Sequence, residues 1–195
     1  MMSLQRQKQK ANTRRQIIDA AIDLFARDGL TATRTSDIAS TAKVSHGTVF
    51  AHFQTRDILL DAAIEEFGAR IMNRLHELVN ENCGLKEVLE AHLKGIGEYE
   101  IFYTRMVLES RLLGQNSRNA LIAIQSAISF HISQIAEKEM KASKIKVMPI
   151  DLLFNSWIGL VHHYLVNGDL FAPDSSVIER YSKQLVEHYI ALVTK

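Results

Sequence analysis

The segment from Thr33 to Phe53 combines small, polar and basic side chains of the kind that contact DNA. Two short helical patterns, Ser36 to Ala42 and His46 to Phe53, are joined by Lys43-Val44-Ser45, and Ser45 is suited to cap the second helix. Apolar residues on both helices can pack inward, namely Ile38, Ala39, Ala42, Val44, Val49 and Phe53. Two short helices held at a steep angle by such an inner face form a helix-turn-helix, whose second helix can enter the major groove.

The outer face of the second helix is small at its centre. At 100° per residue, Gly47 and Ala51 lie opposite Val49. Gly47 allows the backbone to approach the bases, and Ala51 can touch a thymine methyl, but neither residue can form a bidentate hydrogen bond with a base edge. We therefore expect phosphate contacts to supply most of the affinity. The residue types and their positions favour DNA contact by Thr33, Arg34, Thr35, His46, Gly47, Thr48, Ala51 and His52.

The block from Gly29 to Arg56 resembles the DNA-binding domain of the tetracycline-repressor (TetR) family, and the family's Ile-x-x-Ala-x-x-Leu-Phe helix precedes it at Ile18 to Phe25. The resemblance implies a dimer that binds an operator and releases it when a small molecule binds. It also adds four residues to the expected DNA interface, namely Lys43, Ser45, Phe50 and Arg56.

Three positions depart from the family pattern. Lys43 stands where the family usually has glycine, so a left-handed conformation is expected there at a cost on the order of 1 kcal/mol. Phe50 replaces a common tyrosine and lacks the hydroxyl that would bind the DNA backbone, so packing in the core is the favoured interpretation. Arg56 replaces a lysine, keeps the charge and is expected to reach a phosphate.

The distribution of charge agrees with a DNA-binding N-terminal part. The net charge of the 195-residue chain is only +1, but residues 1–60 carry nine basic and five acidic side chains, whereas the remainder carries 14 and 17. A basic end on an acidic body suits a polyanionic partner, although a solvated basic tail would give the same balance. Cys83 is the single cysteine. No apolar run reaches the roughly 18 to 20 residues of a membrane span. We expect a cytoplasmic protein with no cofactor.

Apolar periodicity predicts an all-α fold with about nine helices and no convincing strand. Besides the helix-turn-helix, the predicted helices are Gln7–Arg27, Asp57–Val79, Leu85–Glu98, Ile101–Leu113, Arg118–Met140, Pro149–Val166 and Ser176–Leu192. These give a three-helix DNA-binding domain over residues 1–56 and a larger helical effector-binding and dimerisation domain over residues 57–195.

Aromatic and polarizable residues gather in the central helices of the second domain. They suit a mostly apolar pocket, which the family resemblance implies, but they suit ordinary core packing as well. The candidates are Tyr99, Phe102, Tyr103, Met106, Glu109, Phe130, His131, Trp157 and His162. Glu109 is among the polar anchors, although Arg105 lies four residues before it and the two can pair on one helix surface.

Other functions find less support in the sequence. The adjacent His162 and His163 point about 100° apart on a helix, so a metal site is not expected. No nucleophile elbow, phosphate loop or dinucleotide motif indicates an enzyme. The last two helices carry apolar residues on more than one face, and the resemblance implies that they form a homodimer interface, which predicts a palindromic operator. A DNA-binding regulator without an effector remains an alternative.

Overall fold

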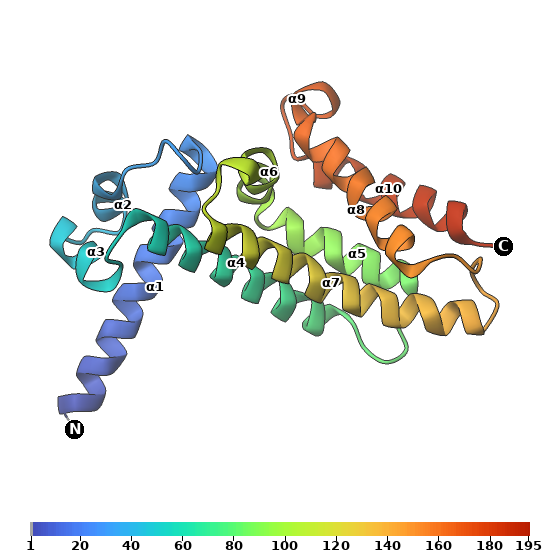
Figure 1. Cartoon of the computed structure of the whole chain (residues 1–195), viewed down its shortest axis with the longest axis horizontal. Coiled ribbons are helices and arrows are strands. Elements are labelled where there is room, and N and C mark those ends of the chain that lie inside the picture. The colour runs from blue at the N-terminus through green and yellow to red at the C-terminus, as the bar shows by residue number, and fades with distance from the viewer. Residues whose placement is uncertain (1) are drawn as a thin grey trace. The chain divides into compact units, whose positions relative to one another are not determined.

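The protein was described by a computed structural model that covers the backbone of residues 2–195 and the side chains from Leu4 onward (Figure 1). Within these residues the chain is helical, without a β-strand beyond one isolated bridge between Ile145 and Thr194, and the all-α prediction is confirmed. The elements are α1 (Met2–Asp28), α2 (Thr35–Thr41), α3 (His46–His52), α4 (Arg56–Leu78), α5 (Leu85–Gly97), α6 (Glu100–Glu109), η1 (Ser110–Leu112), α7 (Gln115–Lys141), α8 (Ile150–Val166), α9 (Gly168–Phe171) and α10 (Val177–Val193). Among the described residues, no helix has both the length and the apolar character that crossing a membrane requires.

The one helix that the sequence pattern does not predict is α9. The pair Asn167-Gly168 indicates only the end of the preceding helix, but the chain makes one further turn there, in which the N–H groups of Leu170 and Phe171 donate to the carbonyl of Asn167 at 3.0 and 3.1 Å. The ring of Phe171 stacks on Tyr164, with 4.3 Å between the ring centroids. A single turn is too short to show helical periodicity, so the sequence pattern does not predict this helix.

The chain forms two compact units. One comprises the chain up to Phe67 together with Ile101–Leu121, and the other comprises Gly68–Glu100 together with Ile122–Lys195. The helices α4 and α7 each continue from one unit into the other. The predicted domain boundary at residue 56 separates two expected functions, whereas the two units are defined by their compactness. That boundary therefore stays a prediction.

The core of the first unit is built on the second half of α1. Its buried side chains include Ile17, Ala21, Leu24 and Phe25, and α2 and α3 add Ile38, Ala39, Val49 and Phe53. The helix α1 ends where Gly29 adopts a φ of 98°, a left-handed conformation that glycine takes without steric cost. The short helices α2 and α3 pack on each other, and α2 packs on α1.

The second unit is organised by α5, α8 and α10. The helix α10 packs against both α5 and α8, and its N-terminus is held by Glu100. The two carboxylate oxygens of Glu100 accept hydrogen bonds from the N–H groups of Val177 and Ile178 at 2.8 and 3.0 Å. The Oγ of Ser176 accepts a hydrogen bond from the N–H of Glu179 at 3.0 Å and so caps α10. Because the first N–H groups of a helix lack internal partners, these side chains fix where α10 begins.

Candidate nucleic-acid interface

The helix α3 presents a small, open outer face. Ser45 caps it as predicted, since its Oγ accepts a hydrogen bond from the N–H of Thr48 at 3.0 Å. Val49 is buried, whereas Gly47 and Ala51 are exposed, so the predicted inner and outer faces are confirmed. A Cβ added to Gly47 would meet only the Oγ of Ser45, at 3.8 Å. The packing of the protein therefore does not require glycine at this position.

The turn between α2 and α3 contains the predicted left-handed residue. Lys43 has a φ of 54°, and the N–H groups of Lys43 and Val44 donate to the carbonyls of Ser40 and Ala39 at 3.1 and 3.0 Å. A lysine in this region costs on the order of 1 kcal/mol relative to a relaxed backbone. The side chain is exposed, so its charge is available to a phosphate.

The prediction that Phe50 packs in the core is wrong. Its side chain is 43% exposed, whereas Val49 on α3 and Phe53, the residue directly after the helix, are buried. The ring of His46 meets the Phe50 ring edge-on, with 4.7 Å between the centroids. The Nε2 of His46 lies 3.0 Å from the Oγ1 of Thr35. Phe50 thus belongs to a surface group that connects α3 with the start of α2.

Thr33 and Arg56 hold the chain between α1 and α2. The Oγ1 of Thr33 lies within hydrogen-bond reach of the carbonyls of Gly29 and Leu24, at 2.7 and 3.2 Å, and this side chain is only 3% exposed. The Nε of Arg56 donates to the carbonyl of Thr33 at 2.9 Å, and its guanidinium lies 5.5 Å from the centroid of the Phe25 ring. The Thr33 hydroxyl therefore has no exposed surface for a phosphate, and much of Arg56 is engaged within the protein.

Glu109, one of the predicted effector residues, binds the backbone of the turn after α1. Its carboxylate accepts hydrogen bonds from the N–H groups of Leu30 and Thr31 at 3.3 and 3.2 Å. The neighbouring Arg105 donates from Nε to the carbonyl of Ala26 at 3.3 Å, rather than pairing with Glu109. Both side chains of α6 thus bind the end of α1 and the turn after it. The bonded residues lie 78 or 79 positions earlier in the chain, beyond the reach of any local pattern.

Cations of α1 lie close to the end of α3. Burial, together with the charges of Lys10 and Arg14, lowers the pKa of His52 below its usual value. The guanidinium of Arg14 lies 4.9 Å from the centroid of the Phe53 ring, within the range of a cation–π interaction. Positive charge from α1 is therefore part of the same surface as the C-terminal end of α3.

Three predicted effector residues belong to the core of the first unit. Phe102, Tyr103 and Met106 are buried, and the rings of Phe102 and Tyr103 each lie 5.7 Å from the ring of Phe67. Tyr99, in the second unit, is half-buried, and its hydroxyl accepts a hydrogen bond from Arg70 Nη1 at 3.4 Å. This packing agrees with the core interpretation for the three buried residues.

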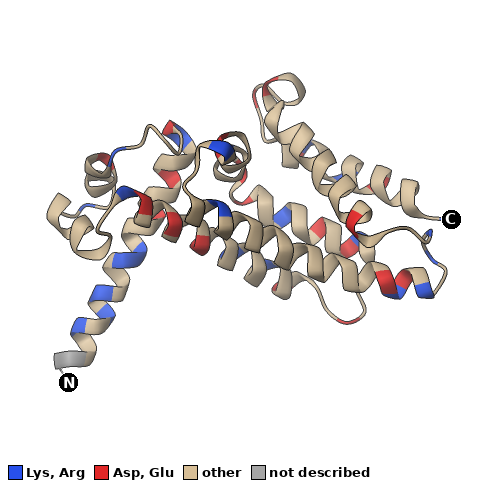
Figure 2. Cartoon of the chain, viewed as in Figure 1, with Lys and Arg blue, Asp and Glu red and all other residues tan. Residues whose placement is uncertain are grey.

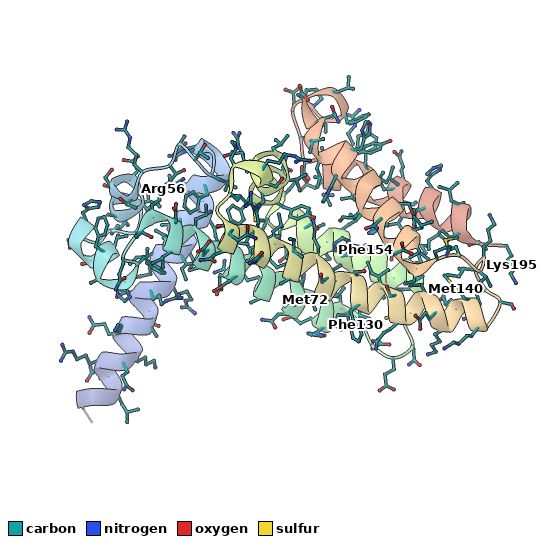
Figure 3. The ribbon with its side chains drawn as sticks, viewed as in Figure 1. Arg56, Met72, Phe130, Met140, Phe154 and Lys195 are labelled. Carbon is teal, nitrogen blue, oxygen red and sulfur yellow. The ribbon has the colours of Figure 1, made fainter. Side chains whose placement is uncertain are left out.

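The remaining effector candidates are dispersed in the second unit. Trp157 is fully buried, whereas Phe130 is 61% exposed on α7 (Figure 3). His131 meets the ring of His76 edge-on at 5.1 Å and lines a cavity of about 350 Å³ between α4, α5 and α7. Burial lowers the pKa of His162 to about 4.

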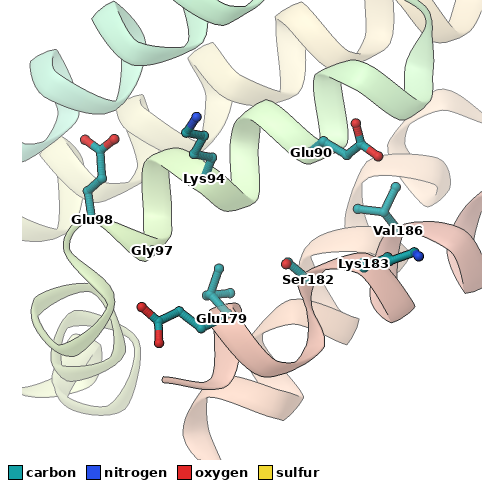
Figure 4. Close-up of a pocket in the computed structure, with 9 residues that line it drawn as sticks. Glu90, Lys94, Gly97, Glu98, Glu179, Ser182, Lys183 and Val186 are labelled. Atoms are coloured by element: carbon teal, nitrogen blue, oxygen red, sulfur yellow. The ribbon is translucent and has the colours of Figure 1, made fainter. Parts of the chain in front are cut away.

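A larger cavity, of about 610 Å³, lies between α5 and α10 (Figure 4). Polar and charged residues contribute to its lining together with apolar surface, and none of the predicted effector residues is part of it: the lining residues are Glu90, Lys94, Gly97, Glu98, Ile178, Glu179, Ser182, Lys183 and Val186. In the part of the chain that the structure describes, no three His, Cys, Asp or Glu side chains are grouped to hold a metal ion.

His92 is a buried polar residue that the sequence-based candidates missed. It is 1% exposed, its Nδ1 accepts a hydrogen bond from Trp157 Nε1 at 3.1 Å, and its Nε2 has no partner. Burial and then the neighbouring His162 lower the pKa of His92 to about 4. The available signal was its spacing from Val88, Leu89 and Ile96 on the apolar stripe of α5. Because Nδ1 accepts, Nε2 carries the hydrogen, and an N–H left unpaired in a core costs about 1–3 kcal/mol.

Comparison with known proteins gives a consistent result. Residues 17–63 match the model of bacterial regulatory proteins of the tetR family. An HTH-type transcriptional repressor of Mycobacterium tuberculosis is 47% identical over 60 residues, which are 31% of this chain and 32% of the repressor. The fatty acid metabolism regulator protein of Bacillus subtilis is 33% identical over 82 residues, 42% of either chain. These matches thus span a third to two fifths of the curated relatives.

The fold of the whole chain also has solved counterparts. The transcriptional regulator FadR from Bacillus subtilis, solved in complex with stearoyl-CoA, superposes with a TM-score of 0.76 over 90% of this chain and 97% of its own, at 20% identity. The similarity in sequence is therefore concentrated at the N-terminus, whereas the similarity in fold extends over both units.

Because Arg56 binds the carbonyl of Thr33, we expect its replacement to lower the stability of the protein even when the positive charge is kept. Arg56→Lys keeps the charge but removes the Nε donor and the planar group over Phe25, and it should lower the free energy of unfolding by about 1–2 kcal/mol. Urea denaturation followed by circular dichroism measures this change. The exposed Arg27→Lys is the control and should be without effect. Wild-type stability in Arg56→Lys would refute the positioning role.

The lowered pKa values of the buried His92 and the half-buried His162 predict acid sensitivity. Histidine in the unfolded chain protonates near pH 6.5, whereas His92 and His162 protonate at about 4 in the folded protein. Their contribution to stability is therefore complete above pH 6.5. Each contribution falls by up to about 1.4 kcal/mol per pH unit as the pH drops from 6.5 towards 4. Urea unfolding between pH 7.5 and 5 should show a shallower decline for His162→Phe than for the wild type, whereas the exposed His188→Gln should follow the wild type. Parallel declines in all three proteins would contradict this.

Proposed function

We infer from the N-terminal match and from the fold that this chain belongs to the tetR family of bacterial regulatory proteins, and we propose that it is a transcriptional repressor which leaves its operator when a small molecule binds. The observation that carries the proposal is the outer face of α3. Gly47 and Ala51 are exposed, the packing of the protein does not require glycine at position 47, and the cations of α1 lie next to the end of this helix.

Within this function, α3 enters the major groove and phosphates supply most of the affinity. The central Gly47 and Ala51 allow close approach but offer no side-chain hydrogen bonds to bases. The exposed charges of Arg34 and Lys43 are available to phosphates, as are the N–H groups at the start of α2. Thr35, Ser45, His46, Thr48, Phe50 and His52 complete the proposed contact surface, while Thr33 and Arg56 act mainly by fixing the position of α2.

The proposed release mechanism uses the grip of α4 and α6 on the turn after α1. Arg56, the first residue of α4, holds the carbonyl of Thr33, and Glu109, the last residue of α6, holds the N–H groups of Leu30 and Thr31. A small molecule bound by residues 57–195 that shifts either helix would move this turn, and with it α2 and α3. Such coupling is reciprocal, so DNA binding would weaken effector binding by the same factor.

The effector is proposed to be largely apolar with a hydrogen-bond acceptor. A relative in the N-terminal part is named a fatty acid metabolism regulator, and a solved protein of this fold was captured with stearoyl-CoA. In this chain, Trp157 and His162 lie on the same helix, and the unpartnered Nε2 of His92 is a donor that an acceptor oxygen would satisfy. Tyr99 and His131 remain proposed pocket residues.

Dimerisation is proposed through α8 and α10. The two helices run antiparallel in contact, since the hydroxyl of Tyr189 near the end of α10 donates to the carbonyl of Leu153 near the start of α8. Leu152 and Leu192 beside these residues are 59% and 54% exposed. Burial of such side chains by a second copy contributes about 25 cal/mol per Å² of apolar surface. A two-fold dimer would present two α3 helices to a palindromic operator.

The first test of the proposed function is binding of the full-length protein to the DNA upstream of its own and neighbouring genes. Selective, salt-sensitive binding in a fluorescence anisotropy titration is expected. Gly47→Ala should weaken this binding, because a methyl group would separate the backbone from the groove. The same change should leave the protein as stable or stabilise it by up to about 1 kcal/mol, because alanine favours helix.

If Gly47→Ala lowers the affinity for DNA but does not lower the stability of the protein, the outer face of α3 contacts DNA and has no structural role. Unchanged affinity in Gly47→Ala would contradict the placement of α3, and equal binding to unrelated DNA would contradict operator recognition. A broad metabolite library that alters neither affinity nor thermal stability would favour the regulator without an effector. Turnover of a small molecule would favour an enzyme instead.

The dimer is tested by charge substitution on α8. Light scattering should find a dimer for the wild type and a monomer for Leu152→Glu, because the partner would have to bury an unpaired carboxylate. The control is Leu112→Glu, at a residue 70% exposed on η1, which should stay dimeric. Circular dichroism verifies that both variants are folded. A dimeric Leu152→Glu would place the interface elsewhere.

A further inference from the structure

The first half of α1 has no core beneath it. The helix spans Met2–Asp28, yet from Leu4 to Gln16 every side chain is exposed except the half-buried Thr13, and Ile17 is the first buried residue from Leu4 onward. This half carries five cations, and the first acid of the chain is Asp19. Figure 2 shows them as successive basic turns. Folding of the first unit does not explain why this basic segment is helical.

The cations are divided between two faces of the helix. At 100° per residue, Arg6, Lys10 and Arg14 follow one another at intervals of four and form one stripe, which we call the basic stripe. Lys8 and Arg15 lie on another side, roughly 150° away on average. The chain therefore contains two sets of cations with similar charge and different directions.

The basic stripe lies on the side of α1 that adjoins α3. Its last member, Arg14, sits over the ring of Phe53 at 4.9 Å from the centroid. Lys10 and Arg14 both act on the imidazole of His52, the final residue of α3. The stripe thus begins beside the helix that is proposed to enter the groove and continues along α1 away from it.

Within the protein alone, this arrangement is unfavourable. Like charges four residues apart on a helix repel each other, and the stripe contains two such pairs, Arg6 with Lys10 and Lys10 with Arg14. Isolated helices of this length are marginal in water. A row of negative charges along the stripe would remove the repulsion and favour the helix. The phosphates of the DNA strand beside α3 form such a row.

We propose that the basic stripe is a second DNA-contacting surface, which binds the sugar-phosphate backbone of the duplex next to the groove that α3 enters. This inference rests on the proposed function. The stripe adds affinity and orients the first unit on the duplex, while the small face of α3 contacts the bases. The positions of Lys8 and Arg15 exclude them from the same contact.

The test compares two double variants of the full-length protein that each remove two positive charges. Arg6→Gln/Lys10→Gln should bind the wild-type operator on the order of tenfold more weakly at 150 mM salt, and the slope of log affinity against log salt should fall by about 0.9 for each phosphate that the variant no longer binds. Lys8→Gln/Arg15→Gln should stay within about twofold of the wild type, since it leaves the stripe intact. Arg14 is left unchanged because it packs on Phe53.

Hydrogen exchange gives a second readout of the same interaction. Operator DNA should slow exchange of the amides of residues 4–12 in the wild type and in Lys8→Gln/Arg15→Gln, but not in Arg6→Gln/Lys10→Gln. An equal decrease of affinity in both double variants would show an effect of net charge alone and overturn the proposal, as would unchanged affinity in both. Wild-type protein that binds no operator refutes the proposed function instead, so the two failures are distinguishable.

Discussion

The backbone between Gly29 and Thr33 turns the chain from α1 into α2, and side chains bind several of its polar groups. The hydroxyl of Thr33 bonds back to the end of α1, Arg56 holds the Thr33 carbonyl, and Glu109 accepts from two amides of the turn. Charged groups make stronger hydrogen bonds than neutral ones. The placement of α2 and α3 depends on these contacts because both helices have only seven residues and cannot form stably alone.

The proposed DNA-contacting surface of the first unit contains two kinds of residue, small uncharged ones and cations. In the proposed complex with DNA, the uncharged Gly47 and Ala51 at the centre of the α3 face allow close approach, while Arg34, Lys43 and the basic stripe of α1 supply positive charge. Attraction to phosphates acts at a distance and does not depend on base sequence, whereas close approach allows the shape of the groove to be recognised. In such a complex, the surrounding cations supply most of the affinity for DNA, and the close fit of α3 to the groove supplies the selectivity.

The interior of the second unit contains histidine side chains among apolar and aromatic residues. His92 is buried against Trp157 with one N–H unpaired, and His162 nearby is held neutral by burial. Such a core is less stable than an apolar one of the same shape, because a buried donor loses its bonds to water. Under the proposed function, an acceptor oxygen of the effector would satisfy this donor. The cavity between α5 and α10 is lined by none of these aromatic or histidine side chains.

Local sequence was sufficient to predict the long helices, the helix-turn-helix, the left-handed Lys43 and the small face of α3. Each of these follows from periodicity or from the conformational limits of one residue, which act over a few positions of the chain. The roles of Thr33, Glu109 and His92 and the exposure of Phe50 emerged only from the packing of the folded chain. Periodicity shows which side of a helix is apolar, but the partner that bonds a buried group can lie 79 residues away, as Leu30 does from Glu109. A short helix such as α3 also has too few inward positions for all its apolar residues, and the packing selected Val49 and Phe53 over Phe50.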